Sequence, residues 1–84
     1  MRKSMFSEDY DRFLSLLRDA REEIGMTQQE LAERLDTDQS TISKCERGER
    51  RIDVIELRRW CQALGTKFQP FIARLDRTLG RGSG

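Results

Sequence analysis

The sequence contains no histidine, two cysteines, one proline and no long run of apolar residues. Because histidine is the commonest general base and the usual activator of a nucleophile, its absence weighs against much of enzyme chemistry. The carboxylates follow no recognisable catalytic pattern, so we expect that the protein is not an enzyme. Cys45 and Cys61 are sixteen positions apart, which is not the spacing of a zinc site, so no metal or other cofactor is expected.

No apolar segment approaches the length of a transmembrane helix, and the beginning of the chain lacks the hydrophobic stretch of a signal peptide. We therefore expect a cytoplasmic protein with no membrane partner. In that compartment Cys45 and Cys61 should stay reduced. We interpret both as buried, inert thiols, with redox sensing as the less favoured alternative.

Charge is abundant in the 84 residues but nearly balanced, with 16 Lys and Arg against 15 Asp and Glu and a net charge of +1. Such a small net charge does not by itself indicate a nucleic-acid partner. The distribution is uneven, however. Residues 8–38 carry ten acidic and four basic side chains, whereas residues 39–84 carry ten basic and five acidic ones. This asymmetry allows one electropositive face on a nearly neutral domain.

Apolar residues recur at intervals of three and four along the chain, and no useful strand alternation is present, which predicts an all-α fold of five helices. The helix ends are expected at glycines, a proline and capping side chains, namely Gly25, Thr27, Asp38, Gly48, Asp53, Gly65 and Pro70. Ile24 and Val54 are assigned to inward faces and Trp60 to the edge of the core. We expect a flexible arm over residues 1–7, one domain over residues 8–79 and a disordered tail over residues 80–84.

The helix predicted from about Gln39 to Arg47 has two different faces. Ile42 and Cys45 are expected to point inward. The outer face is entirely polar and comprises Gln39, Ser40, Ser43, Lys44 and Arg47. Such side chains bind base edges and phosphates, but the solvated surface of a small helical bundle has the same composition. The helical wheel alone leaves both interpretations open.

Spacing favours the first interpretation, because a capped short helix, a tight turn, a polar-faced helix and a basic loop form the DNA-reading arrangement. MTQQELAERL at residues 26–35 and TISKCERG at 41–48 resemble the second and third helices of the Cro and phage-repressor family, often called XRE. ERRIDVIEL at 49–57 resembles the start of its fourth helix. The resemblance covers roughly residues 10–75. It implies a five-helix lambda-repressor-like domain that binds double-stranded DNA through a helix-turn-helix at the second and third helices.

The resemblance also implies roles for individual residues. Those that would read bases are Gln39, Ser40, Ser43 and Lys44. Those that would contact the DNA backbone are Gln28, Thr37, Arg47, Arg50 and Arg51. Arg21 and Glu46 match positions of a buried or half-buried ion pair between the first and third helices. Ala32 is small, as a close helix crossing requires.

Relatives of this kind usually bind as twofold dimers, so a homodimer is expected. The last helix is the candidate interface because it has more apolar surface than its own docking needs. Its candidate residues are Phe68, Phe71, Ile72, Leu75 and Leu79. The alternative is that all of this surface closes the core of the monomer.

The hypothesis is a sequence-specific transcriptional regulator that represses by occupying a palindromic operator as a homodimer. Two alternatives remain open. The same fold serves as the antitoxin of a toxin–antitoxin pair, with a toxin as partner, or as a restriction–modification controller. The second alternative is a helical protein-interaction module that does not bind DNA, and its supporting feature is the near-neutral net charge.

Overall fold

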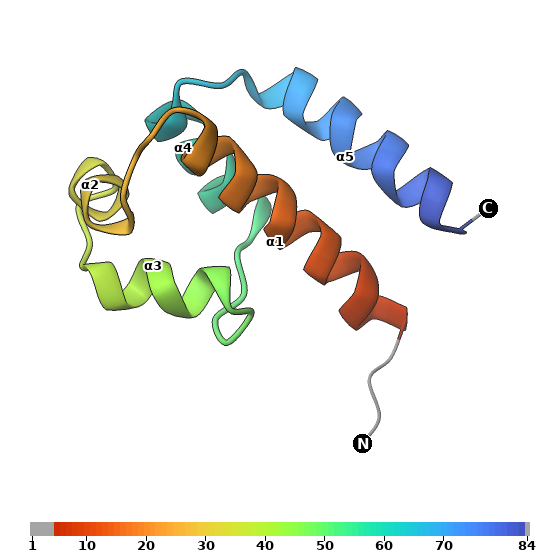
Figure 1. Cartoon of the computed structure of the whole chain (residues 1–84), viewed down its shortest axis with the longest axis horizontal. Coiled ribbons are helices and arrows are strands. Elements are labelled where there is room, and N and C mark those ends of the chain that lie inside the picture. Colours follow the sequence, from red (N-terminus) through yellow and green to blue (C-terminus); the bar gives the residue numbers. More distant parts are fainter. Residues whose placement is uncertain (1–4, 84) are drawn as a thin grey trace.

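The computed structural model describes residues 5–83, and the side chains of residues 8–80. The described residues form five helices and no strand, which confirms the predicted all-α fold (Figure 1). The helices are α1 (Met5–Glu23), α2 (Gln28–Arg34), α3 (Gln39–Glu46), α4 (Val54–Leu64) and α5 (Phe68–Ser83). None of the described helices is both long and apolar enough to cross a membrane.

Both terminal helices are longer than the sequence predicts. α1 begins at Met5, inside the expected arm, and α5 continues to Ser83, through most of the expected tail. Residues 1–4 and 84, which make up the rest of the arm and tail, lie outside the described residues. A glycine within a helix costs only about 1 kcal/mol relative to alanine. For this reason Gly80 weakens α5 without ending it.

α5 also begins earlier than predicted, at Phe68 and not at Pro70. Pro70 occupies the first turn, where backbone N–H groups have no partner within the helix. A missing N–H therefore carries no penalty there, and proline is compatible with this position as well as with the first residue.

The beginnings of α2 and α4 are stabilised by reciprocal capping, as the sequence predicts. At α2 the hydroxyl of Thr27 accepts the N–H of Glu30 (3.0 Å), and Glu30 Oε1 accepts the N–H of Thr27 (2.8 Å). Asp53 and Glu56 form the same two bonds at α4, at 2.8 and 3.1 Å. These caps satisfy backbone donors that have no partner inside the helix.

The core lies where the five helices meet. α1 crosses the middle of the molecule in Figure 1, with α5 along one side and α2 and α3 at one end, and it packs against both α3 and α5. Ala32 of α2 is fully buried, and α2 packs closely against α3. The buried apolar residues are Phe13, Leu14, Leu17, Met26, Leu31, Ala32, Ile42, Cys45, Leu57, Trp60, Cys61, Leu64 and Phe71.

Three predictions of burial are wrong. Ile24 and Val54, assigned to inward faces, are 54% and 61% exposed, whereas Trp60, assigned to the edge of the core, is 4% exposed. Ile24 follows the last residue of α1 and Val54 is the first residue of α4. Periodicity identifies the face of a residue, but it does not show whether a neighbouring helix extends far enough to cover it.

The end of α3 approaches α1 closely at Gly48. The backbone there has φ +82°, and a Cβ atom would lie 3.3 Å from Leu14 Cδ1. A side chain at this position would therefore strain both the backbone and the contact between the helices. The turn between α2 and α3 has a similar conformation at Asp36, with φ +58°, which aspartate adopts more readily than most residues.

Asp38 caps α3 with a single carboxylate oxygen. Asp38 Oδ1 accepts the hydroxyl of Thr41 (2.8 Å), the N–H of Thr41 (2.9 Å) and the hydroxyl of Ser40 (3.1 Å). The Thr41 hydroxyl, the Thr41 N–H and the Ser40 hydroxyl together hold the pKa of Asp38 below its ordinary value of 3.8. The charged carboxylate is thus the form that stabilises the beginning of α3.

We expect Asp38→Ala to lower the melting temperature by about 5 °C at neutral pH, because it removes this cap. Because the pKa of Asp38 is lower in the folded protein than in the unfolded chain, its carboxylate stabilises the fold fully at pH values above the pKa of the unfolded chain. This stabilisation disappears as the pH falls through the pKa of the folded protein. The measurement is thermal unfolding by circular dichroism at several pH values. The melting temperatures of the natural chain and of Asp38→Ala should therefore approach each other in acid. Asp38→Asn is the matched control, since asparagine caps without a charge. A loss in the asparagine variant as large as that in the alanine variant would contradict the capping role.

Candidate nucleic-acid interface

α3 has one buried face and one polar face. Ile42, Cys45 and Glu46 are buried, and Glu46 is the single charged residue among them. Gln39, Ser40 and Lys44 are exposed, and Ser43 is half-buried. The four residues assigned to base reading therefore lie on the part of α3 that is not in the core.

The buried face of α3 is tied to α1 by a bidentate ion pair. Arg21 Nε donates to Glu46 Oε2 at 2.7 Å, and Arg21 Nη2 donates to Glu46 Oε1 at 3.0 Å. Arg21 Nη1 donates to the carbonyl oxygen of Met26 at 2.8 Å. Arg21 and Glu46 are 8% and 5% exposed. Their polar groups are therefore bonded where water is largely excluded, which such a pair requires.

The ion pair continues toward the surface through two glutamines. Glu46 Oε1 accepts Gln28 Nε2 at 2.8 Å, and Gln28 Oε1 accepts Gln39 Nε2 at 2.7 Å. We call Arg21, Glu46, Gln28 and Gln39 the polar chain. It connects a buried pair on α1 and α3 to the first residue of α2 and the first, exposed residue of α3.

The polar chain determines the orientation of both amides. A carboxylate only accepts hydrogen bonds, so the Gln28 group that faces Glu46 must be the NH2 group. Gln28 consequently presents its oxygen to Gln39, which must donate. The oxygen of Gln39 and its second N–H then remain for another partner. The family resemblance implies that Gln28 contacts a DNA phosphate, and it does not predict the bonds of Gln28 to Glu46 and Gln39.

The arginines assigned to DNA phosphates have partners within the protein. Arg47 forms two bonds with the carboxylate of Glu49, at 2.9 and 3.1 Å, and a third with the hydroxyl of Ser43. The hydrogen bond with Glu49 raises the pKa of Arg47, and the bond with Arg47 lowers the pKa of Glu49. Both groups are thus ionised at neutral pH, and both side chains are exposed.

Arg50 and Arg51 are held in different ways. Arg50 Nη2 donates to Glu56 at 2.9 Å, and Arg50 Nη1 donates to Cys45 Sγ at 3.5 Å. The bond with Glu56 is the main reason why the pKa of Arg50 is raised. The guanidinium of Arg51 stacks over the ring of Tyr10, 4.4 Å from its centre. Tyr10 also anchors the loop between α3 and α4, because its hydroxyl accepts the N–H of the next residue, Ile52, at 3.0 Å.

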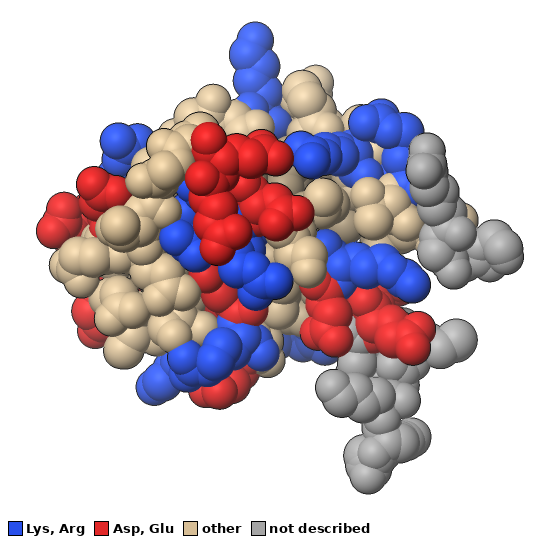
Figure 2. Space-filling model, in the orientation of Figure 1, with Lys and Arg blue, Asp and Glu red and all other residues tan. Residues whose placement is uncertain are grey.

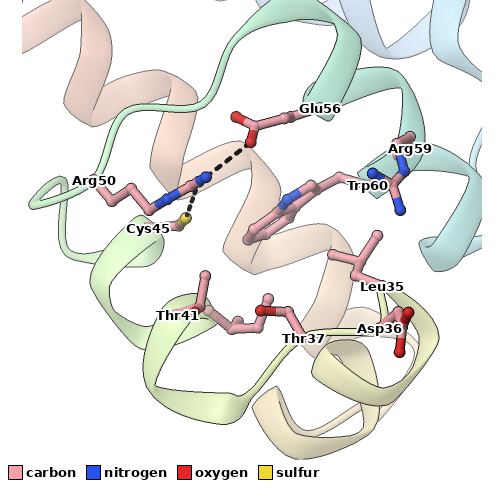
Figure 3. Close-up of a pocket in the computed structure, with 10 residues that line it drawn as sticks. Leu35, Asp36, Thr37, Thr41, Cys45, Arg50, Glu56, Arg59 and Trp60 are labelled. Carbon is pink, nitrogen blue, oxygen red and sulfur yellow. Dashed lines mark hydrogen bonds and ion pairs between the residues drawn. The ribbon is translucent and has the colours of Figure 1, made fainter.

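Lys44 and Thr37 complete the assigned set. Lys44 is exposed and has no hydrogen bond or ion pair with any residue that the structure describes. Thr37 lies in the turn between α2 and α3, where its side chain lines a cavity and not the polar face of α3 (Figure 3). The structure thus brings Gln28 and Gln39 together, whereas Thr37 lines a cavity that neither glutamine lines.

Charges are unevenly distributed over the surface. On the face shown in Figure 2, acidic side chains gather over α1, whereas basic side chains lie both near α3 and its following loop and along α5. The exposed cations of α3 and this loop are Lys44, Arg47, Arg50 and Arg51. Because Glu49 and Glu56 pair with two of them, the local positive charge is moderate.

α5 divides the interface candidates into two groups. Phe71 is buried and meets Phe13 edge-on, with ring centres 6.4 Å apart, so its assignment to an interface is wrong and it closes the monomer core. The remaining candidates are half-buried and line a groove of about 490 Å³ along α5; they are Phe68, Ile72, Leu75 and Leu79.

Comparisons with family models and with solved structures indicate the same family. A sequence profile described as helix-turn-helix matches residues 17–71. An XRE-family like protein from Pseudomonas syringae pv. tomato str. DC3000 is 40% identical, with a TM-score of 0.83 over 88% of this chain and 90% of that one. These findings confirm the resemblance inferred from the sequence. No curated protein matches the chain.

Two further structures share the fold. The wild-type restriction–modification controller protein C.Esp1396I has a TM-score of 0.79 and is 24% identical, over 94% of this chain and 99% of that one. The tetramer of C.Esp1396I in complex with its natural 35-base-pair operator has a TM-score of 0.75 and is 25% identical, over 89% and 95%.

Removing one partner of the ion pair should destabilise the fold strongly. We expect Arg21→Met or Glu46→Leu each to cost about 3–5 kcal/mol of unfolding free energy, because each leaves a buried charge without its partner. The double variant should cost clearly less than the sum, since neither charge remains. Urea denaturation of the four proteins measures this coupling. Strictly additive losses would show that the pair does not act as a unit.

Proposed function

The chain belongs to the helix-turn-helix family, and we propose that it is a sequence-specific DNA-binding regulator of transcription that reads the major groove with α3. The observation that carries this proposal is the polar chain. It holds Gln39 on the exposed side of α3 by hydrogen bonds that begin in the core. A solvated helix face needs no such support, whereas reading bases needs a side chain with one orientation.

Gln39 has the groups that adenine requires. Its oxygen accepts from the adenine N6 amino group, and its free N–H donates to N7, which makes a bidentate contact in the major groove. Ser40 and Ser43 are short enough for α3 to approach the bases closely. Lys44 has no partner among the described residues and reaches the acceptors of guanine. These four residues are the proposed reading set.

Contacts with the DNA backbone are proposed for Gln28, Arg47, Arg50 and Arg51. Gln28 retains one N–H for a phosphate while it orients Gln39. Arg51 stacks on Tyr10 through the face of its guanidinium, so its in-plane N–H groups remain available. Arg47 and Arg50 each keep N–H groups that the bonds to Glu49 and Glu56 do not use, and these would donate to phosphates. Thr37 is the fifth proposed backbone contact, and its side chain also lines the cavity beside α3.

We further propose that the protein acts as a homodimer on a palindromic operator and represses by occupying it. The exposed part of α5 supplies an apolar surface for a second copy, through Phe68, Ile72, Leu75 and Leu79. A twofold dimer places two reading helices about 34–36 Å apart, which is one turn of DNA. The similar protein C.Esp1396I is a tetramer in the complex with its operator, so a protein with this fold is oligomeric on DNA in that case.

A restriction–modification controller is the second candidate. The similarity to C.Esp1396I over almost the full length of both chains favours it. A gene for a restriction nuclease next to the gene for this protein would support this candidate, and its absence would favour a regulator of other genes.

Selection of bound sequences from a random DNA pool tests the proposed function. We expect a palindromic motif and an affinity that falls steeply with salt, since arginines and lysine displace counterions from phosphates. A motif with a single half-site would contradict the dimer. Binding with no preferred sequence and no salt dependence would contradict the DNA-binding function itself.

Gln39→Ala should relax the preference at one position of each half-site and cost about 1–3 kcal/mol of discrimination there. The reason is that alanine has neither the oxygen nor the N–H that the base would bind. Selection with the variant protein measures this change. Gln62→Ala, at an exposed glutamine of α4, is the matched control and should leave the motif unchanged. An unchanged motif for Gln39→Ala would remove this residue from the reading set.

A further inference from the structure

A cavity of about 390 Å³ lies behind α3, on the side of α4 (Figure 3). Its walls come from the end of α2, the turn that follows, α3, the next loop and α4. The volume is within the range of small-molecule sites. The lining residues are Leu35, Asp36, Thr37, Thr41, Ile42, Cys45, Arg50, Glu56, Arg59 and Trp60.

Trp60 is the unusual member of this lining. Its side chain is almost completely buried, yet its indole N–H donates to no residue that the structure describes. A buried tryptophan N–H usually has a partner. Within the described part of the chain, no buried side-chain nitrogen or oxygen lacks one. The N–H must therefore retain access to open space, and Trp60 is one of the residues that line the cavity.

Two charged side chains at the same cavity are also without a partner in the described structure. Arg59 and Asp36 are exposed, and neither forms a hydrogen bond or an ion pair through its side chain with a described residue. Figure 3 shows both on the same side of the cavity, next to Trp60 and Leu35. Arg50 and Glu56 differ from them, since they neutralise each other at 2.9 Å.

We propose that this cavity binds a small zwitterion with an apolar side chain, that is, an α-amino acid. Trp60 Nε1 and the guanidinium of Arg59 donate to the carboxylate, and Asp36 accepts from the ammonium group. Leu35, Ile42 and the ring of Trp60 contact the apolar side chain. A ligand with a carboxylate alone satisfies Arg59 but is repelled by Asp36, so a zwitterion matches the charges better.

Since Thr41, Ile42 and Cys45 of α3 form one wall, an occupied cavity braces α3 against α4. Any effect of the ligand on operator binding rests on the proposed function. Ligand binding itself does not, because it is measured on the protein alone. Its failure would leave the DNA-binding proposal intact.

The test is a titration with L-phenylalanine followed by tryptophan fluorescence, because Trp60 is the single tryptophan of the chain. We expect a saturable change in emission with a Kd of about 1 mM. Benzoate, which lacks the ammonium group, should bind more weakly. No saturable change at about ten times this concentration would overturn the proposal. Equal affinity for benzoate would overturn the role of Asp36 and hence the zwitterion.

Variants locate the site. Arg59→Ala should weaken binding about ten- to a hundredfold, because it removes a charge-assisted hydrogen bond. Arg58→Ala, at the exposed neighbouring arginine outside the cavity lining, is the matched control and should bind as the natural chain does. Circular dichroism checks that both variants are folded. Equal binding by Arg59→Ala would show that phenylalanine binds elsewhere.

Discussion

The bidentate pair between Arg21 and Glu46 is the interaction on which the position of α3 depends. It bonds a buried carboxylate of α3 to a buried guanidinium of α1, and that guanidinium also bonds the backbone of Met26 ahead of α2. Three helices are thereby held by one group of charges. Buried charges tolerate few geometries, since each must keep its partners. The same carboxylate then orients Gln28, so the constraint extends from the core to the polar surface of α3.

Local chemistry explains why much of the fold follows from the sequence. Capping residues such as Thr27 and Asp53 bond groups three residues away, so a short segment of sequence is enough to predict them. Inward residues such as Leu31 and Ile42 recur with the helical period. Features set by distant neighbours do not follow in this way. The depth of Trp60 and the exposure of Val54 depend on which helices pack nearby. The extent of α5 was also missed, because its two glycines weaken the helix too little to end it.

The candidate interface shows the same division. The polar face of α3 and the ion pair of Arg21 with Glu46 were inferred from spacing and family resemblance. The bonds of Gln28 were not, because they join residues 18 and 11 positions apart. The sequence feature that could have indicated these bonds is a glutamine at the first position of each of two successive helices. Phe71 shows the converse limit, because an apolar side chain on the expected helix still points where packing directs it, here into the core.

If the polar chain is what makes α3 a reading helix, Gln28 contributes to sequence preference without touching a base. The most direct measurement is the sequence motif selected by a Gln28→Leu variant whose folding is verified. The expected result is a relaxed preference at the base pair that Gln39 reads, because Gln39 has lost the acceptor that orients its amide. An unchanged motif with uniformly weaker binding would mean that Gln28 contacts only a phosphate, and would contradict a positioning role for the polar chain.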